Sequence, residues 1–167
     1  MFAHLATLSL PWERVHLWQV DERQVPLDDP ARNLGLLVAS GLAALARLHP
    51  MPVGSGTPDD YARALADTRL DLVHLGLGAD GHTASLVPGD PALDSTAPVA
   101  WAGPYQGTRR MTLTFPTLRA ARAVLFVVGG ADKAEAVRHL REGDARCVAA
   151  RLAHPNTHLL TDLLVGA

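Results

Sequence analysis

Three apolar, β-prone segments of this chain each run into a polar or glycine-rich cluster, and this pattern constrains the fold more than any other feature. Residues 15–20, 70–77 and 123–128 have the composition of buried strands. Helical patterns separate these segments. The sequence therefore predicts an α/β protein with a three-layer, doubly wound, mostly parallel sheet and helices on both faces, as in Rossmann-like folds.

The clusters at the strand ends predict where a ligand binds. They are Asp21-Glu22-Arg23, the loop 76–83 and Gly129-Gly130. Ligands of such sheets bind beyond the carboxyl ends of the strands. The three clusters are therefore expected to meet at one site.

The remaining elements are predicted from capping signals and apolar spacing. Asp29 followed by Pro30 predicts one helix start, and Thr57 followed by Pro58 predicts another. The first helix is expected to bury a face formed by Leu34, Leu37, Val38, Leu42, Leu45 and Leu48. Further expected elements are strands at 111–115 and near 147–152 and a helix over 131–141.

Composition excludes several classes of protein. The 167 residues suit a single domain, 1–167, and a net charge of −2 argues against a nucleic-acid partner. No apolar run approaches the roughly 20 residues that cross a bilayer, so no membrane partner is expected. The N-terminus lacks the features of a signal peptide, and one cysteine, Cys147, cannot form an intrachain disulfide. A cytoplasmic location is the expectation.

The loop after the second strand is the strongest candidate for chemistry. Its glycines permit a sharp turn and a close backbone approach to a ligand. Asp80 and His82 are expected beside a helix start, where free N–H groups favour an anion. A histidine there can act as a general base near neutral pH. The alternative is a plain strand-to-helix turn with an incidental histidine and a capping aspartate.

This loop resembles the signature of the 6-phosphogluconolactonase family, which runs Gly-x-Gly-x-Asp-Gly-His-Thr-Ala-Ser-Leu and is followed by proline and glycine. The related glucosamine-6-phosphate deaminases carry a glutamate five residues after the histidine, where this chain has Val87. The resemblance extends to the Asp21-Glu22-Arg23 loop, to Arg110 in an Arg-x-Thr-Leu-Thr strand and to Lys133, the only lysine of the chain.

The resemblance implies hydrolysis of 6-phospho-D-glucono-1,5-lactone without metal or other cofactor. His82 would activate water, Asp21 would orient that histidine or the substrate hydroxyls, and Arg23 would bind or polarise substrate oxygens. Asp80 belongs to the same substrate-binding loop. Arg110 and Lys133 would clamp the phosphate, and the backbone around Gly78 and Gly81 would steady the oxyanion. Asp21 and Arg23 could each equally be half of a structural ion pair. His154 and His158 do not form a metal pair, because Pro155 lies between them.

Family members begin with a further β-loop-α unit whose glycine-rich loop wraps the phosphate, and no such unit precedes Trp12. The stretch from Gly54 to Pro58 imitates that loop, but a turn and a helix start explain its composition. The fold is therefore expected to be N-terminally truncated, as a fragment, a self-associating chain or a degenerate domain. Two other functions stay open: deamination or isomerisation of a sugar phosphate on the same scaffold, and a non-catalytic sugar-phosphate-binding or assembly module.

Overall fold

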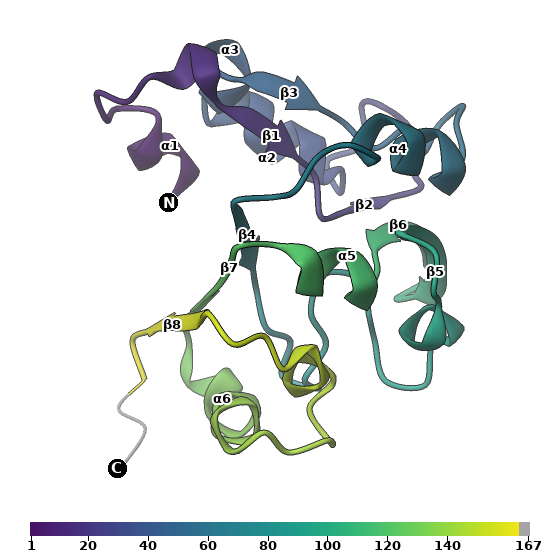
Figure 1. The fold of residues 1–167 in the computed structure, drawn as a ribbon, viewed down its shortest axis with the longest axis vertical. Coiled ribbons are helices and arrows are strands. Elements are labelled where there is room, and N and C mark those ends of the chain that lie inside the picture. The colour runs from purple at the N-terminus through teal and green to yellow at the C-terminus, as the bar shows by residue number, and fades with distance from the viewer. Residues whose placement is uncertain (164–167) are drawn as a thin grey trace.

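The computed structural model describes residues 1–163, whose helices and strands alternate along the chain (Figure 1). The strands are β1 (His16–Trp18), β2 (Asp21–Arg23), β3 (Arg47–His49), β4 (Leu72–Leu75), β5 (Val99–Tyr105), β6 (Thr108–Leu113), β7 (Ala123–Val128) and β8 (Thr157–Thr161). The α-helices are α1 (Phe2–Leu5), α2 (Asn33–Ala39), α3 (Leu42–Leu45), α4 (Pro58–Leu65), α5 (Phe115–Ala120) and α6 (Ala134–Glu142).

Two of the three sheets are parallel, as predicted. Strand β4 pairs with β7 and β7 with β8, all parallel, and β1 pairs in parallel with β3. The third sheet, in the order β2-β6-β5, is antiparallel and was not predicted. Its pairing makes Asp21-Glu22-Arg23 a strand in its own right, where the sequence indicated only a charged loop.

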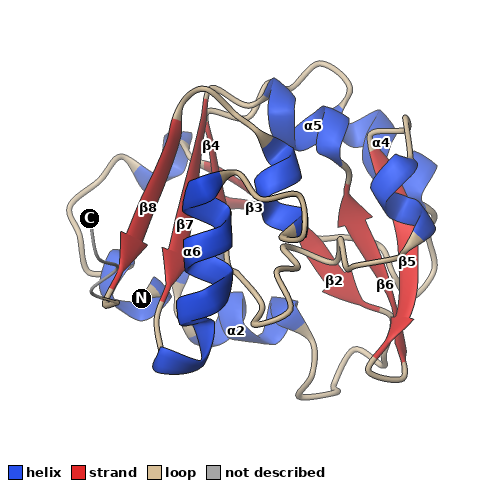
Figure 2. Ribbon diagram, turned by 90° about the horizontal axis from the view of Figure 1, so that it is seen from below, coloured by secondary structure: helices blue, strands red, loops and turns tan. Residues whose placement is uncertain are grey.

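Helices lie on both faces of the β4-β7-β8 sheet. Figure 2 shows α6 in front of β7, and α6 buries Ala136 and Val137 in the core. On the other face, the ring of Phe2 in α1 contacts His74 of β4, with ring centroids 5.8 Å apart. This layering confirms the predicted α/β, Rossmann-like class.

The hydrophobic core joins the parallel sheet to the antiparallel one. Val73 and Phe126 come from the parallel sheet, Met111 and Leu113 come from β6, and Leu118 comes from α5. Each of these side chains is at most 1% exposed. The β4 and β7 strand ends and the β2-β6-β5 sheet are therefore held in fixed relative positions.

The helix expected after Asp29 begins at Asn33 instead. Asp29 accepts a hydrogen bond from Ala31 N–H (2.8 Å), which makes a local turn rather than a helix cap. The first N–H groups of α2, on Asn33 and Leu34, donate to the buried carboxylate of Glu22, each at 2.8 Å. A carboxylate from β2 thus does the capping, which a local sequence pattern cannot reveal.

The expected apolar face of this region is also only partly correct. Leu42 is buried, whereas Val38 and Leu45 are exposed. The segment breaks into α2 and α3 at Gly41 (φ +82°), and Leu48 lies in β3. The break explains why one continuous helical stripe does not form.

We expect Glu22→Gln to destabilise the protein by about 3–5 kcal/mol, because it removes the negative charge that faces a buried guanidinium. Arg32 Nε lies 3.5 Å from the Glu22 carboxylate, and Gln19 Nε2 also donates to it at 2.9 Å. Urea unfolding would measure the loss. Glu142→Gln is the matched control, since Glu142 is exposed, and it should change stability by less than about 0.5 kcal/mol. Equal stability of the two variants would contradict this account.

Helix α4 confirms the second predicted helix start. Thr57 and Asp60 form a reciprocal capping box, and Pro58 occupies the first turn. The stretch from Gly54 to Pro58 is thereby a turn and a helix start, as interpreted from the sequence.

The strand predicted near 147–152 is wrong. Residues Val148–Leu152 form a 3₁₀ helix, and the last strand is β8. The segment has the apolar composition of a strand because it buries Val148, Ala149 and Leu152 in the core. Its backbone also supports the glycine-rich loop, since Ala149 N–H donates to the carbonyl of Gly81 (3.0 Å).

Within the described part of the chain, no helix has the length and apolar character needed to cross a membrane.

Candidate active site

One cleft collects most of the residues predicted for the site. It has a volume of about 340 Å³, and its lining includes Asp21, Arg23, Gly78, His82, Arg110 and Lys133. Asp80 does not line the cleft but is hydrogen-bonded to His82, which does, and Gly81 lies in the same turn. Two of the three clusters at the strand ends therefore meet in the cleft, whereas Gly129-Gly130 does not line it and only Lys133, in the segment that follows, reaches it.

His82 is paired with Asp80. Its Nδ1 lies 2.6 Å from Asp80 Oδ1, and its backbone N–H donates to the same oxygen at 3.2 Å. Burial acts to raise the pKa of Asp80, but the hydrogen bonds from His82 and Tyr105 and the His82 charge outweigh it and lower the pKa. Asp80 is therefore ionised at neutral pH, and its carboxylate accepts a hydrogen bond from His82 Nδ1–H. Nε2 is left as the nitrogen that can take a proton from water.

The glycines of the loop leave room for the His82 and Asp80 side chains, because a side chain at either glycine would clash with its neighbours. A Cβ on Gly78 would lie 2.0 Å from His82 Nδ1 and 2.5 Å from Asp80 Oδ1. Gly81 has φ +83°, and a Cβ there would lie 2.9 Å from Cys147 Cα. Both positions therefore require glycine for the loop to keep this shape.

One expectation for this loop is corrected. No helix starts after His82, because residues 83–86 form a turn closed by a bridge between Thr83 and Leu86. The N–H of Gly78 donates to His82 O and that of Gly81 to Gly78 O, both at 2.9 Å, so these two groups already have acceptors within the turn. Oxyanion binding by the backbone around Gly78 and Gly81 stays a prediction, and it would need other N–H groups of the loop.

Asp21 is held by groups other than His82. Ser85 Oγ donates to Asp21 Oδ2 (2.7 Å), and Asn33 Nδ2 lies 3.2 Å from Oδ1. Burial raises the pKa of Asp21, against the lowering effect of the Ser85 hydrogen bond and of Arg110. The expectation that Asp21 orients the histidine is therefore wrong, because Asp80 takes that position. Asp21 remains in the cleft wall, where it can meet substrate hydroxyls.

The cleft has more positive than negative charge. Arg23 and Arg110 stand directly opposite each other across β2 and β6, and Lys133 lies at the start of α6. Like charges at opposite positions destabilise a sheet unless an anion offsets them. Burial and the charge of Arg23 both lower the pKa of Arg110, and its Nε is buried without a hydrogen-bond partner. One nitrogen of Arg23 donates to Ala31 O at 2.6 Å, and Lys133 Nζ lies 3.0 Å from the Asp132 carboxylate. These features fit an anion-binding end of the cleft.

Tyr105 and Ser85 are site residues whose roles the sequence did not indicate. Tyr105 Oη donates to Asp80 Oδ2 (3.1 Å), and its ring lies edge-on to the His82 ring. Ser85 lies in the signature string, but its bond to Asp21 spans 64 positions of sequence. This hydrogen bond is apparent only from the tertiary structure, which brings residues 76–86 next to β2.

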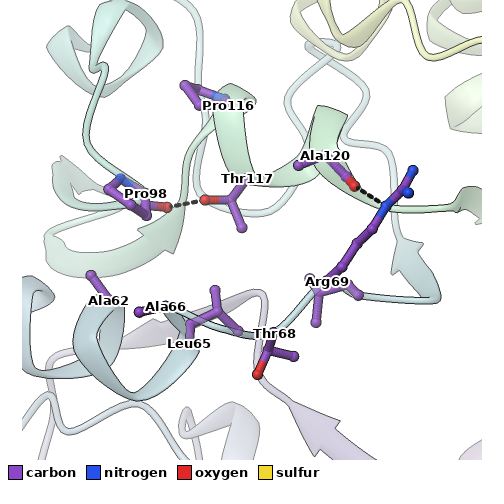
Figure 3. A pocket seen from close by; sticks show the side chains of 10 residues that line it. Ala62, Leu65, Ala66, Thr68, Arg69, Pro98, Pro116, Thr117 and Ala120 are labelled. Carbon is purple, nitrogen blue, oxygen red and sulfur yellow. Dashed lines mark hydrogen bonds between the residues drawn. The ribbon is translucent and has the colours of Figure 1, made fainter.

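A second cavity, of about 240 Å³, lies between α4 and α5 (Figure 3). It is lined mainly by apolar groups such as Leu65, Pro98 and Pro116. Its one charged residue, Arg69, donates through Nε to the carbonyl of Ala120 (2.9 Å). It offers no acid–base pair, so the chemistry is assigned to the first cleft.

Residues 1–163 contain no cluster of three or more histidine, cysteine, aspartate or glutamate side chains suited to a metal ion. That the site works without metal or cofactor stays a prediction.

Comparison with known proteins gives a consistent result. The profile of the family described as glucosamine-6-phosphate isomerases/6-phosphogluconolactonase matches residues 1–164. A 6-phosphogluconolactonase of Synechocystis is 34% identical, over 96% of this chain and 75% of the relative. A human protein named GDH/6PGL endoplasmic bifunctional protein is 41% identical over 81% of this chain, which spans only 20% of that longer protein. The crystal structure of 6-phosphogluconolactonase from Thermotoga maritima superposes with a TM-score of 0.85 at 26% identity, over 96% of this chain and 78% of that one.

Proposed function

Since the chain belongs to the family of glucosamine-6-phosphate isomerases and 6-phosphogluconolactonases, we propose that it hydrolyses 6-phospho-D-glucono-1,5-lactone to 6-phosphogluconate. The observation that carries the proposal is the His82–Asp80 pair at the edge of a cleft with three cationic side chains and one carboxylate. The His82–Asp80 pair supplies a base for water, and the positive charge of the cleft suits a phosphorylated substrate.

His82 acts as the general base. Asp80 holds Nδ1–H, and Nε2 takes a proton from water as the water oxygen bonds to the lactone carbonyl carbon. The tetrahedral intermediate then expels the ring oxygen, and the imidazolium returns the proton to that leaving oxygen. One water is consumed, the carbon–oxygen bond of the ring breaks, and the histidine ends neutral.

The other side chains bind and orient the substrate. Arg110 and Lys133 hold the phosphate, because a guanidinium and an ammonium form strong charge-assisted hydrogen bonds to it. Arg23 and Asp21 line the same cleft, and in this proposal Arg23 polarises substrate oxygens while Asp21 accepts hydrogen bonds from sugar hydroxyls. A cytoplasmic location belongs to the proposal, resting on the single free cysteine, Cys147.

Deamination of an amino-sugar phosphate is disfavoured by Val87. Its side chain is apolar and buried, so no carboxylate stands at the position where the deaminases carry glutamate.

The test is a coupled assay of 6-phosphogluconate release from fresh lactone, corrected for spontaneous hydrolysis. We expect a rate above background, and a kcat/KM at least tenfold lower for unphosphorylated glucono-1,5-lactone, since the phosphate contacts contribute roughly 1.5–3 kcal/mol each. Glucosamine-6-phosphate should give no ammonia. A folded chain without excess lactone hydrolysis would overturn the proposal. Loss of ammonia from glucosamine-6-phosphate would favour the deaminase alternative.

A further inference from the structure

We propose that Tyr105 is a positioning residue that fixes the Asp80–His82 pair through its hydroxyl and supports Arg110 through its ring. The inference rests on the proposed function for its effect on turnover, but its contacts can be tested without turnover. Tyr105 lies on the β5-β6 hairpin, whereas Asp80 and His82 lie on the loop after β4.

The hydroxyl completes the binding of the Asp80 carboxylate. Oδ1 accepts from His82 Nδ1 at 2.6 Å and Oδ2 accepts from Tyr105 Oη at 3.1 Å. With both oxygens engaged, the carboxylate cannot rotate without breaking a hydrogen bond. The plane of Asp80, and with it the imidazole of His82, is therefore set partly from outside the loop.

The ring of Tyr105 lies near two residues of the cleft, His82 and Arg110. Its centroid lies 5.2 Å from that of His82, with the rings at 60°, and 5.0 Å from the Arg110 guanidinium carbon. In the part of the chain that the structure describes, no acidic side chain forms an ion pair with Arg110, which is only 5% exposed. The face of an aromatic ring is an attractive surface for such a guanidinium.

The hairpin explains how Tyr105 reaches this place. Gln106 and Gly107 form a two-residue turn with φ +52° and +76°, typical of a type I′ hairpin, and Tyr105 pairs with Thr108. Side chains two apart on a strand share a face, so Arg110 lies on the same face as Thr108 and Tyr105. One side chain thus bridges the predicted base and the predicted phosphate site.

Two variants separate the hydroxyl from the ring. Tyr105→Phe keeps the ring, and we expect kcat to fall roughly tenfold while KM changes less than about twofold. Tyr105→Leu removes the ring as well, and we expect it also to weaken binding of inorganic phosphate, by roughly threefold or more. Titration of phosphate followed by phosphorus NMR would measure this binding in both variants.

A spectroscopic readout is independent of turnover. The His82 Nδ1–H proton should give a downfield resonance that is missing in His82→Ala, and Tyr105→Phe should move or broaden it. Tyr61→Phe is the matched control: the Tyr61 hydroxyl donates to Gln19 O and His49 O, so its loss should lower stability and leave the resonance and kcat unchanged.

The outcomes distinguish the two proposals. An unmoved resonance together with a wild-type kcat in Tyr105→Phe would overturn the role of Tyr105. An inactive wild-type chain would overturn the proposed lactonase function, while the resonance and the phosphate titration would still decide whether Tyr105 positions the pair.

Discussion

Replacing His82 by alanine is expected to lower kcat by about 10²–10⁴-fold, because the variant loses the base that takes a proton from the attacking water. KM should change much less, since the phosphate contacts of Arg110 and Lys133 remain. The measurement is the coupled assay with spontaneous hydrolysis subtracted.

His158→Ala is the control for this variant. His158 is exposed on β8, and its Nε2 lies 2.9 Å from Asn156 Oδ1, so the change removes a histidine outside the cleft. It should leave kcat unaltered. Retained activity in His82→Ala would show that another group activates the water.

Adding one methyl group at Gly78 is expected to lower kcat by about 10²-fold or more. The new Cβ would stand 2.0 Å from His82 Nδ1 and 2.3 Å from its Cε1, so the imidazole must leave its bond to Asp80. A misplaced general base forfeits most of its contribution. Gly78 does not have a positive φ, so the backbone tolerates alanine and the effect should fall on the pair rather than on folding.

Gly54→Ala separates this effect from the general effect of replacing a loop glycine by alanine. Gly54 does not line the cleft, does not have a positive φ, and a Cβ there has no neighbour within 4 Å. We expect Gly54→Ala to keep kcat, with both variants compared for kcat and for the urea unfolding midpoint. Equal activity of Gly78→Ala and wild type would contradict the geometry of the loop described above.

Local patterns predicted the elements that short stretches of sequence specify. The apolar run of β7 and the capping box at the start of α4 are each encoded within a few residues, and both are confirmed. The strand predicted after Cys147 was wrong, because an apolar run that is buried as a 3₁₀ helix has the same composition as a buried strand.

The candidate site was predictable where its residues lie in one motif. Asp80 and His82 were found together because two positions separate them, and Lys133 because it starts a helix after a recognisable strand. The sequence left open whether Asp21 orients His82 or the substrate hydroxyls, and the structure pairs His82 with Asp80 instead. The direction of a side chain in a glycine-rich turn depends on backbone angles that the motif does not specify.

The sequence by itself thus determined the α/β alternation, the glycine-rich loop and most of the charged groups of the cleft. Only the tertiary structure decided that Arg23 stands opposite Arg110, that Glu22 caps α2 and that Tyr105 reaches Asp80. The physical reason is the separation in sequence of the groups that interact. Helix caps and strand composition reflect energies between near neighbours in the chain. The register of β2 on β6 and the approach of a hairpin to a loop depend instead on packing between segments distant in sequence, which no local pattern encodes.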